Sequence, residues 1–367
     1  MKKIIIIGAG PVGCFLAQLL KNYGFRPTLI EEHEKVGRPV HCTGLVGSKL
    51  FKQKWPIPLP RECIINKIDG AIVNYDRQKF VLKRECVAYV INRYIFDSRL
   101  SRGLDIVFRA KFIGLEKKKS GYLIDTTSGE FSADIVIGAD GADSSLRPIV
   151  DPNFKTIRYN GVQFRVKLKD SDRSLVRLYL MGSYFFWIVP ETNGVVRIGT
   201  ISGNPYQDLL NFMKAINIKG EVIEKFAGTV SLGTGNTVRG NLAIVGGAAC
   251  QIKPLSYGGI YYGLRCAQIL ADCISKGKLW EYERLWKRAF LRQIAIGLRI
   301  SQLYAKLSHQ DLKRVFIFLK GKAGLIEQYG DFEDHAGLIL KIAKEPDFYR
   351  NAGGVLWRFL NMLIDTT

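Results

Sequence analysis

The feature that most constrains this chain lies near its N-terminal end, where a short apolar run, Ile4–Ile7, meets Gly8-x-Gly10-x-x-Gly13. A helical pattern follows the glycines, and Glu31 closes a second apolar run. The order strand, glycine turn, helix, strand and acid is typical of a βαβ unit that binds a dinucleotide. The sequence therefore predicts a nucleotide site in this segment.

Each residue of the motif has an expected physical role in binding the dinucleotide. We expect Gly8 to form the tight turn, Gly10 to let a pyrophosphate approach the backbone, and Gly13 to let the helix pack on the sheet. The helix N-terminus would offer unpaired N–H groups to the phosphates. Glu31 can accept hydrogen bonds from ribose hydroxyls, as the acid at this distance does in such units.

A secretory signal is the alternative interpretation of the same segment, because Lys2 and Lys3 precede the apolar run. Three glycines and Pro11 interrupt that run, and the next strand follows at once. No later stretch reaches the roughly 18 to 20 apolar residues of a membrane span. We therefore expect a cytoplasmic protein. Seven cysteines without a C-x-x-C pair argue against a disulfide framework and against a metal site.

The net charge of +21 indicates a partner with negative charge. From Arg284 to Lys322 there are ten Lys or Arg and one acid, Asp311, among many Leu, Ile and Phe residues. Helices with basic and apolar faces suit an anionic membrane surface, which would make the protein peripheral to the membrane. An ordinary helical domain with a solvated basic face is the alternative. No nucleic-acid-binding motif accompanies the charge, so we expect no nucleic acid partner.

The pattern of apolar runs predicts an α/β fold with a discontinuous Rossmann-like nucleotide domain. Its parts are residues 1–150 and 236–275, with 50–85 partly contributing to a second domain. That second domain, 151–235, has the alternation of β-strands and would contact the substrate. A helical C-terminal region, 276–367, completes the chain.

Two further glycine clusters carry a resemblance to a known fold family. Gly138-Ala139-Asp140-Gly141, with Ser144 and Arg147, resembles the second fingerprint of the FAD enzymes with the para-hydroxybenzoate hydroxylase fold. Gly246-Gly247-Ala248-Ala249, with Pro254, resembles their third fingerprint, and Arg93 resembles the arginine that reaches the FAD pyrophosphate. The resemblance implies FAD as cofactor, held by Gly8, Gly10, Gly13, Glu31, Arg93, Asp140, Gly141, Arg147, Gly246, Gly247, Gly258 and Gly259.

Two other segments resemble the geranylgeranyl reductase family. Residues 37–44, Gly-Arg-Pro-Val-His-Cys-Thr-Gly, are similar to its cysteine-containing loop, and Phe185-x-Trp187-Ile188-x-Pro190 to its aromatic segment. The resemblance implies reduction of C=C bonds in isoprenoid chains of lipids by hydride transfer from reduced flavin. The implied partners are a prenyl-lipid substrate and a separate electron donor, ferredoxin or NAD(P)H.

The chain departs from these patterns at several positions. Gly247 stands where the third fingerprint usually has an aspartate, and Cys250 where its last glycine is usual. Loss of one charge-assisted hydrogen bond to the ribityl chain costs on the order of 1.5–3 kcal/mol. Phe185 replaces a tyrosine and Val189 a phenylalanine in the aromatic segment. Two alternatives therefore stay open: a flavin-dependent monooxygenase of the same fold, and a non-catalytic member that binds flavin or lipid.

The candidate catalytic residues lie in the cysteine-containing loop. The resemblance places Cys42 near the flavin, whereas the alternative is a cysteine packed under the loop. His41 is a second candidate, as a proton donor, although a histidine in a polar loop can also be incidental. Phe185 and Trp187 would share one face of a strand and line an apolar tunnel, or else fill the core.

Overall fold

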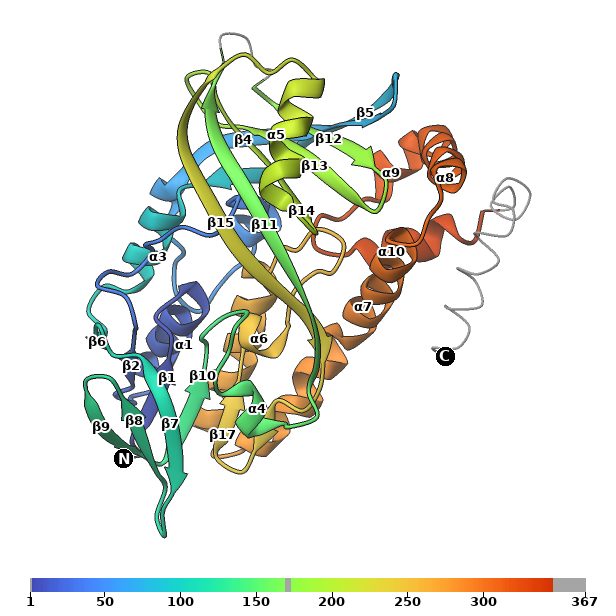
Figure 1. The fold of residues 1–367 in the computed structure, drawn as a ribbon. Helices are drawn as coiled ribbons and strands as arrows, with labels where there is room; N and C mark the ends of the chain where they lie inside the picture. Colours follow the sequence, from blue (N-terminus) through green and yellow to red (C-terminus); the bar gives the residue numbers. More distant parts are fainter. Residues whose placement is uncertain (1, 169–172, 346–367) are drawn as a thin grey trace.

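The structure is a computed structural model that describes residues 2–168 and 173–345. Within these residues the chain forms a six-stranded sheet (sheet A), an eight-stranded sheet (sheet B) and a three-stranded sheet (sheet C). Figure 1 shows sheet A at the bottom, sheet B at the top, and the C-terminal helices along one side. The predicted α/β fold, with a nucleotide-binding sheet, a β-rich part and a helical C-terminal region, is confirmed.

Sheet A contains the predicted dinucleotide unit. Its strand order is β16-β17-β10-β1-β2-β6, and all neighbours pair in parallel except β16 with β17. The strands are β1 (Ile4–Ile7), β2 (Thr28–Ile30), β6 (Asp105–Val107), β10 (Ile135–Gly138), β16 (Val238–Arg239) and β17 (Leu242–Ile244).

Both faces of sheet A are covered, which explains why β1 is four consecutive isoleucines. Ile4 and Ile6 pack with α1 (Pro11–Asn22) and α6 (Ile260–Ser275). Ile5 and Ile7 face the other way and join the core under sheet C. Sheet C consists of β7 (Phe112–Lys117), β8 (Tyr122–Thr126) and β9 (Gly129–Ala133).

Sheet B has the order β15-β11-β14-β13-β12-β4-β5-β3. Its strands are β3 (Leu45–Gly47), β4 (Ile64–Tyr75), β5 (Gln78–Ile91), β11 (Lys155–Lys167), β12 (Leu175–Met181), β13 (Tyr184–Pro190), β14 (Val195–Ser202) and β15 (Glu221–Thr234). The hairpin β4–β5 is one long element of this sheet, formed by residues 64–75 and 78–91. Whether residues 50–85 contribute partly to a second domain stays a prediction. The long strands β11 and β15 pair along their length and run from sheet B down towards sheet A (Figure 1). Whether the sequence positions 150 and 236 separate two domains stays a prediction.

Helix α5 (Pro205–Ala215) covers one face of sheet B, where Phe186 stacks on Phe212 with ring centres 4.0 Å apart. The opposite face of sheet B is therefore the one that remains for the nucleotide-binding part. Helix α3 (Arg93–Leu100) follows β5 directly. The remaining short elements are α2 (Lys49–Lys52), α4 (Arg147–Val150), η1 (Arg61–Cys63), η2 (Gly246–Ala249) and η3 (Leu279–Glu281).

The C-terminal helices are α7 (Tyr282–Tyr304), α8 (His309–Gly321), α9 (Ala323–Tyr329) and α10 (His335–Ile342). Phe316 of α8 packs on Tyr75 and Phe80 of the β4–β5 hairpin, so these helices close one end of sheet B. The last part of the predicted helical region 276–367, residues 346–367, lies outside the described residues. None of the helices described combines the length and the apolar character that a membrane span requires.

Candidate FAD and substrate site

The three glycine clusters interlock at the start of α1. A Cβ added at Gly8 would lie 2.6 Å from the carbonyl oxygen of Ala139, in the second cluster. A Cβ at Gly246 would lie 3.0 Å from the Val12 side chain, in the first turn of α1. A Cβ at Gly247 would lie 3.2 Å from the Cα of Gly141. The clusters that the sequence places far apart therefore form one surface whose parts are in backbone contact.

The start of α1 has the shape that a phosphate needs. A Cβ at Gly13 would lie 2.1 Å from the Gly8 carbonyl oxygen, so the helix can approach the strand only without a side chain there. A Cβ at Gly10, by contrast, would meet no atom within 4 Å. Gly10 is the N-cap, and no side chain caps the helix. Its first N–H groups therefore remain available to an anion.

Glu31, the predicted ribose-binding residue, is held in place by several hydrogen bonds. Its buried carboxylate accepts a hydrogen bond from the Ala9 N–H at 2.8 Å and another from the His33 N–H at 3.0 Å. The His33 ring nitrogen Nδ1 lies 2.6 Å from the same carboxylate. Glu31 is thus held at the carboxyl end of β2, beside the turn of Gly8, where parallel sheets bind their ligands.

Asp140 holds a buried carboxylate with spare hydrogen-bonding capacity. Its Oδ2 accepts the Ser145 N–H at 2.8 Å, whereas Oδ1 is buried without a hydrogen-bond partner among the described residues. Burial raises the pKa of this carboxyl. An unpartnered buried oxygen at this place is what a ligand hydroxyl would satisfy.

Arg147 joins the second and third clusters. Its guanidinium donates to the carbonyl oxygens of Ala248 at 2.7 Å, Ala142 at 2.9 Å and Gly247 at 3.2 Å. Ser231 of β15 also donates to the Ala142 carbonyl, at 2.8 Å. These contacts indicate that Arg147 positions the two loops through their backbones; a direct bond from Arg147 to FAD stays a prediction.

The third cluster contains the two residues that depart from the usual fingerprint, Gly247 and Cys250. Gly247 offers no carboxylate. Cys250 has a φ of +53° and a buried thiol whose pKa burial raises to about 11. This left-handed conformation explains why a glycine is usual here. The Gly258 carbonyl accepts the Lys253 N–H at 3.0 Å, and Gly259 is the N-cap of α6, which also begins without a side-chain cap.

Together these features fit FAD. Open space at Gly10, two uncapped helix starts, the Glu31 carboxylate and the Oδ1 atom of Asp140 supply contacts for phosphates and hydroxyls. Position 247 is the exception, because a glycine there cannot bind a ribityl hydroxyl through a side chain. No cluster of three or more His, Cys, Asp or Glu suited to a metal ion occurs in residues 2–168 and 173–345.

Arg93 and Cys42 lie together at the start of α3. Asn92 caps this helix by accepting the Ile95 N–H at 3.1 Å. The Arg93 guanidinium donates to both oxygens of Asp97, at 3.1 and 2.8 Å, and lies near enough to the Cys42 sulfur to interact with it electrostatically. Burial raises the pKa of Asp97, and the charge of Arg93 opposes this shift. The reach of Arg93 to the pyrophosphate stays a prediction.

The cysteine-containing loop, residues 37–44, is seated between α3 and sheet B. Gly44 N–H points to the Cys42 sulfur at 3.3 Å, and Arg38 lies over the Tyr94 ring, 4.9 Å from its centre. The His41 Nδ1 lies 2.5 Å from the carbonyl oxygen of Ala227 in β15. His41 therefore docks the loop on the sheet; its role as a proton donor stays a prediction, as does the catalytic role of Cys42.

The aromatic segment alternates as expected for a strand. Tyr184 and Phe186 face α5, whereas Phe185 and Trp187 share the opposite face, with ring centres 6.0 Å apart. Phe185 also stacks on Tyr257, which precedes Gly258 of the third cluster, at 6.3 Å and 16°. The aromatic face of β13 thus contacts the loop that carries the third cluster. Substrate binding by Phe185 and Trp187 stays a prediction.

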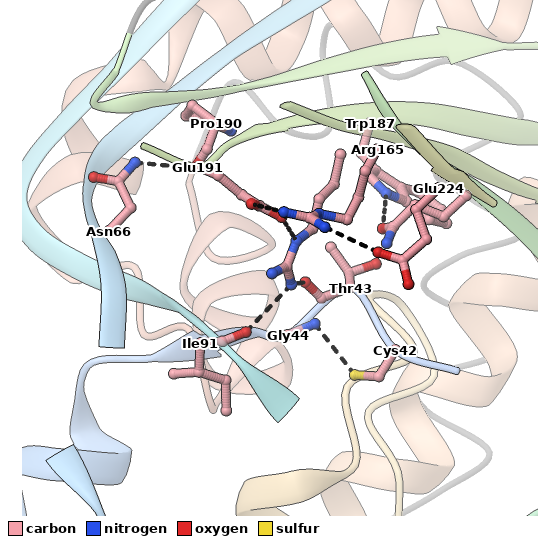
Figure 2. A network of polar contacts seen from close by, with 12 residues as sticks. Cys42, Thr43, Gly44, Asn66, Ile91, Arg165, Trp187, Pro190, Glu191 and Glu224 are labelled. Atoms are coloured by element: carbon pink, nitrogen blue, oxygen red, sulfur yellow. Dashed lines mark hydrogen bonds and ion pairs between the residues drawn. The ribbon is translucent and has the colours of Figure 1, made fainter. Parts of the chain in front are cut away.

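Sequence reasoning missed a group of charged residues on this same face of sheet B, which we call the strand network: Arg165, Glu191, Arg197 and Glu224. Figure 2 labels three of its members, Arg165, Glu191 and Glu224, above Thr43 and Gly44 of the cysteine-containing loop. Arg197 interrupts the apolar start of β14, and Arg165 lies between Phe164 and Val166 in β11. A basic residue buried at such a position needs an acid as partner. This requirement is the sequence signal that could have revealed the network.

Comparisons with known proteins agree with this geometry. A family model described as an FAD binding domain matches residues 1–44. An uncharacterized protein of Methanocaldococcus jannaschii is 31% identical, over 94% of this chain and 95% of its own. Digeranylgeranylglycerophospholipid reductase 1 of Methanococcoides burtonii is 28% identical, over 86% of this chain and 87% of its own.

The fold is also that of a solved structure. A geranylgeranyl bacteriochlorophyll reductase-like protein from Thermoplasma acidophilum superposes with a TM-score of 0.80. The match covers 98% of this chain and 99% of the other, at 22% sequence identity. At that identity the likeness establishes a shared fold over nearly the whole of both chains.

Proposed function

We propose, from the premise that this chain belongs to the geranylgeranyl reductase family of FAD-dependent oxidoreductases, that it reduces C=C bonds in the isoprenoid chains of a lipid. Several relatives are named digeranylgeranylglycerophospholipid reductases. The observation that carries the proposal is the stacking of Phe185 on Tyr257. It sets an aromatic, apolar wall against the FAD-binding loop, as a substrate without polar groups at its reacting carbons requires.

Reduced FAD supplies the hydride for such a reaction, and a proton must come from elsewhere to complete the addition of two hydrogens. The alkene is reduced and the flavin is oxidised in this step. Cys42 is the candidate proton donor, since its thiol lies within electrostatic reach of Arg93, the predicted FAD contact. His41 is the second candidate, but its Nδ1 is engaged with the Ala227 carbonyl.

The flavin must be reduced again after each turnover. We propose a separate electron donor, ferredoxin or NAD(P)H, for this step. The basic and apolar helices α7 and α8 support peripheral binding to an anionic membrane on the cytoplasmic side, where a prenyl lipid would be found.

The test begins with the visible spectrum of the purified protein, which should show bound oxidised flavin. The protein, reduced with dithionite under anaerobic conditions, is then incubated with digeranylgeranylglycerophospholipid in detergent. Mass spectrometry should detect the gain of one hydrogen molecule for each bond reduced. Cys42→Ser should slow this reaction, whereas the matched variant Cys86→Ser, on β5, should leave it unchanged.

Two results would contradict the proposal. A flavin-loaded protein that leaves every geranylgeranyl lipid unreduced would exclude the activity. A product that gains oxygen in air, with NAD(P)H as reductant, would instead identify a monooxygenase of the same fold.

A further inference from the structure

The strand network is a row of charges that crosses sheet B. Glu224 of β15 is the register partner of Arg165 in β11, and Arg165 is the register partner of Arg197 in β14. Two arginines directly opposite each other repel. Glu191, just after β13, separates them: it accepts from Arg165 at 2.9 Å through each of its oxygens, and from Arg197 Nε at 2.5 Å.

The inner half of the row is buried and the outer half is not. The side chains of Arg197 and Glu191 are 9% and 6% exposed, whereas those of Arg165 and Glu224 are 31% and 42% exposed. A buried ion pair is weak as a device for stability alone, because its desolvation offsets the attraction. The remaining contacts of Arg197 therefore indicate what else it does.

Arg197 Nη1 donates to two backbone carbonyls in segments far from it in sequence. One is the carbonyl of Thr43, the residue after Cys42 (Figure 2). The other is the carbonyl of Ile91, at 3.3 Å, immediately before the cap Asn92 and Arg93. One guanidinium thus ties the Cys42 segment to the Arg93 segment.

Gly44 makes room for this arrangement. It has a φ of +69°, and a Cβ there would lie 2.6 Å from Arg197 Nη1 and 2.5 Å from the Ile91 oxygen. The Gly44 carbonyl accepts the Ile91 N–H at 2.8 Å, and the Gly44 N–H points to the Cys42 sulfur. Asn66 donates to the Pro190 carbonyl at 2.9 Å and so fixes the backbone next to Glu191.

We propose that Arg197, oriented by Glu191, is a positioning residue that holds the Cys42 segment beside the Arg93 segment, at the proposed flavin end of the site. It acts through the Thr43 and Ile91 carbonyls, which accept hydrogen bonds from its Nη1. The proposal rests on the proposed function only for the consequence in turnover, since the placement of Cys42 can be measured without any substrate.

The experiment measures alkylation of the full-length, FAD-loaded protein by iodoacetamide, with each cysteine followed by mass spectrometry. Cys86 is also partly exposed and lies in β5, with its N–H bonded to Asp69, so it serves as an internal reference. Five cysteines are buried and report unfolding: Cys14, Cys63, Cys250, Cys266 and Cys273. Arg197→Met should change the rate at Cys42 relative to Cys86 on the order of tenfold, as expected when one charge-assisted hydrogen bond is removed.

Two further variants separate positioning from simple loss of charge. Arg197→Lys retains a donor for the Thr43 carbonyl and should restore part of the wild-type ratio. The double variant Arg197→Met with Glu191→Gln removes the buried charges together and leaves Arg165 paired with Glu224. It should show the same altered ratio as Arg197→Met, and both should lower kcat with KM unchanged.

The result is read from those variants whose buried cysteines stay unlabelled. In them, a ratio of the Cys42 to the Cys86 alkylation rate within about twofold of the wild-type ratio would overturn the proposal. If the wild-type protein itself reduces no prenyl lipid, the proposed function fails, yet the alkylation ratio still decides the role of Arg197.

Discussion

The two ends of the FAD site are built from different materials. At the proposed adenosine end, glycines bring backbones into contact, as where Gly8 meets Ala139 and Gly13 meets Gly8. At the proposed flavin end, the cysteine-containing loop is held by one buried charged side chain, Arg197, that reaches from sheet B. The first arrangement requires glycines, because a side chain there would collide with the neighbouring backbone. The second requires buried charged side chains, which the register of the paired strands brings together.

This difference has a physical consequence for what each end can tolerate. A close backbone contact at a glycine is lost when any side chain is added there. It contains no titratable group, so a change of pH does not affect it. A buried Arg–Glu pair fails when either partner is removed or neutralised, because the other charge is left without compensation. The predictions below test whether the two ends differ in this way.

The largest effect is expected in the strand network. Glu191→Ala should lower the free energy of unfolding by about 3–5 kcal/mol, because it leaves Arg197 buried without an acid. Glu224→Ala, at the exposed end of the same row, should cost under about 1 kcal/mol. Urea unfolding followed by circular dichroism measures both, and equal effects would contradict the distinction between the buried and exposed halves.

Glycine substitutions should separate packing from ligand binding at the adenosine end. Gly13→Ala should destabilise the protein by about 1–3 kcal/mol, since its Cβ would collide with the Gly8 backbone. Gly10→Ala meets no atom and should cost at most about 1 kcal/mol, as a change of helix cap does. Its effect should appear in FAD titration as a weaker affinity. Equal thermal stability of the two variants would be evidence against the predicted role of Gly13.

The carboxylates of Glu191 and Asp140 should contribute to the free energy of unfolding at neutral pH with opposite sign. Burial raises the pKa of Glu191, but Arg165 and Arg197 lower it further, so it lies below its ordinary value. Its contribution to stability is present at neutral pH and is lost as the pH falls below about 4.3, the ordinary value for Glu. Burial raises the pKa of Asp140, so its charge opposes folding at neutral pH and that penalty disappears in acid.

Two isosteric variants test this sign. Glu191→Gln should be less stable than wild type at pH 7, with the difference shrinking towards pH 3. Asp140→Asn in the FAD-free protein should be at least as stable as wild type at pH 7, and that advantage should also vanish in acid. Thermal unfolding at a series of pH values measures both curves; parallel curves with the same sign would refute the expectation.

The smallest effect is expected at Cys250. Cys250→Gly relieves a left-handed conformation but removes a buried side chain, so the net change should lie within about 1 kcal/mol. Cys266→Gly, in the middle of α6, should cost about 2 kcal/mol or more because both helix propensity and packing are reduced. Equal destabilisation by calorimetry would show that backbone strain at Cys250 is negligible.

The sequence predicted the elements whose signals are local. The strands Ile4–Ile7 and Thr28–Ile30 and the helix between them follow from apolar runs and glycines next to each other. The length of the hairpin β4–β5 was not predicted, because register shifts near Asn66 and Gly70 interrupt the alternation that marks a strand.

The strand network was beyond a reading of the sequence. Arg165 and Arg197 are opposite each other only because β11 and β14 pair in one particular register. The partner carbonyl of Arg197 at Thr43 is separated from it by 154 residues. Arg197 in the apolar start of β14 indicated that an acid was needed, but neither the position of the acid nor the loop that Arg197 contacts could be inferred from spacing.

Strand β15 connects both ends of the site within one continuous segment. Glu224 belongs to the strand network and pairs with Arg165. The Ala227 carbonyl lies against the His41 ring, and the Ser231 hydroxyl donates to the Ala142 carbonyl next to the second glycine cluster. The distance along the strand from Glu224 to Ser231 is about 23 Å at 3.3 Å per residue. Inserting or deleting a single residue would turn the side chains beyond it to the other face. We therefore expect that, during evolution, this family could lengthen or shorten β15 at its ends but not between these three contacts.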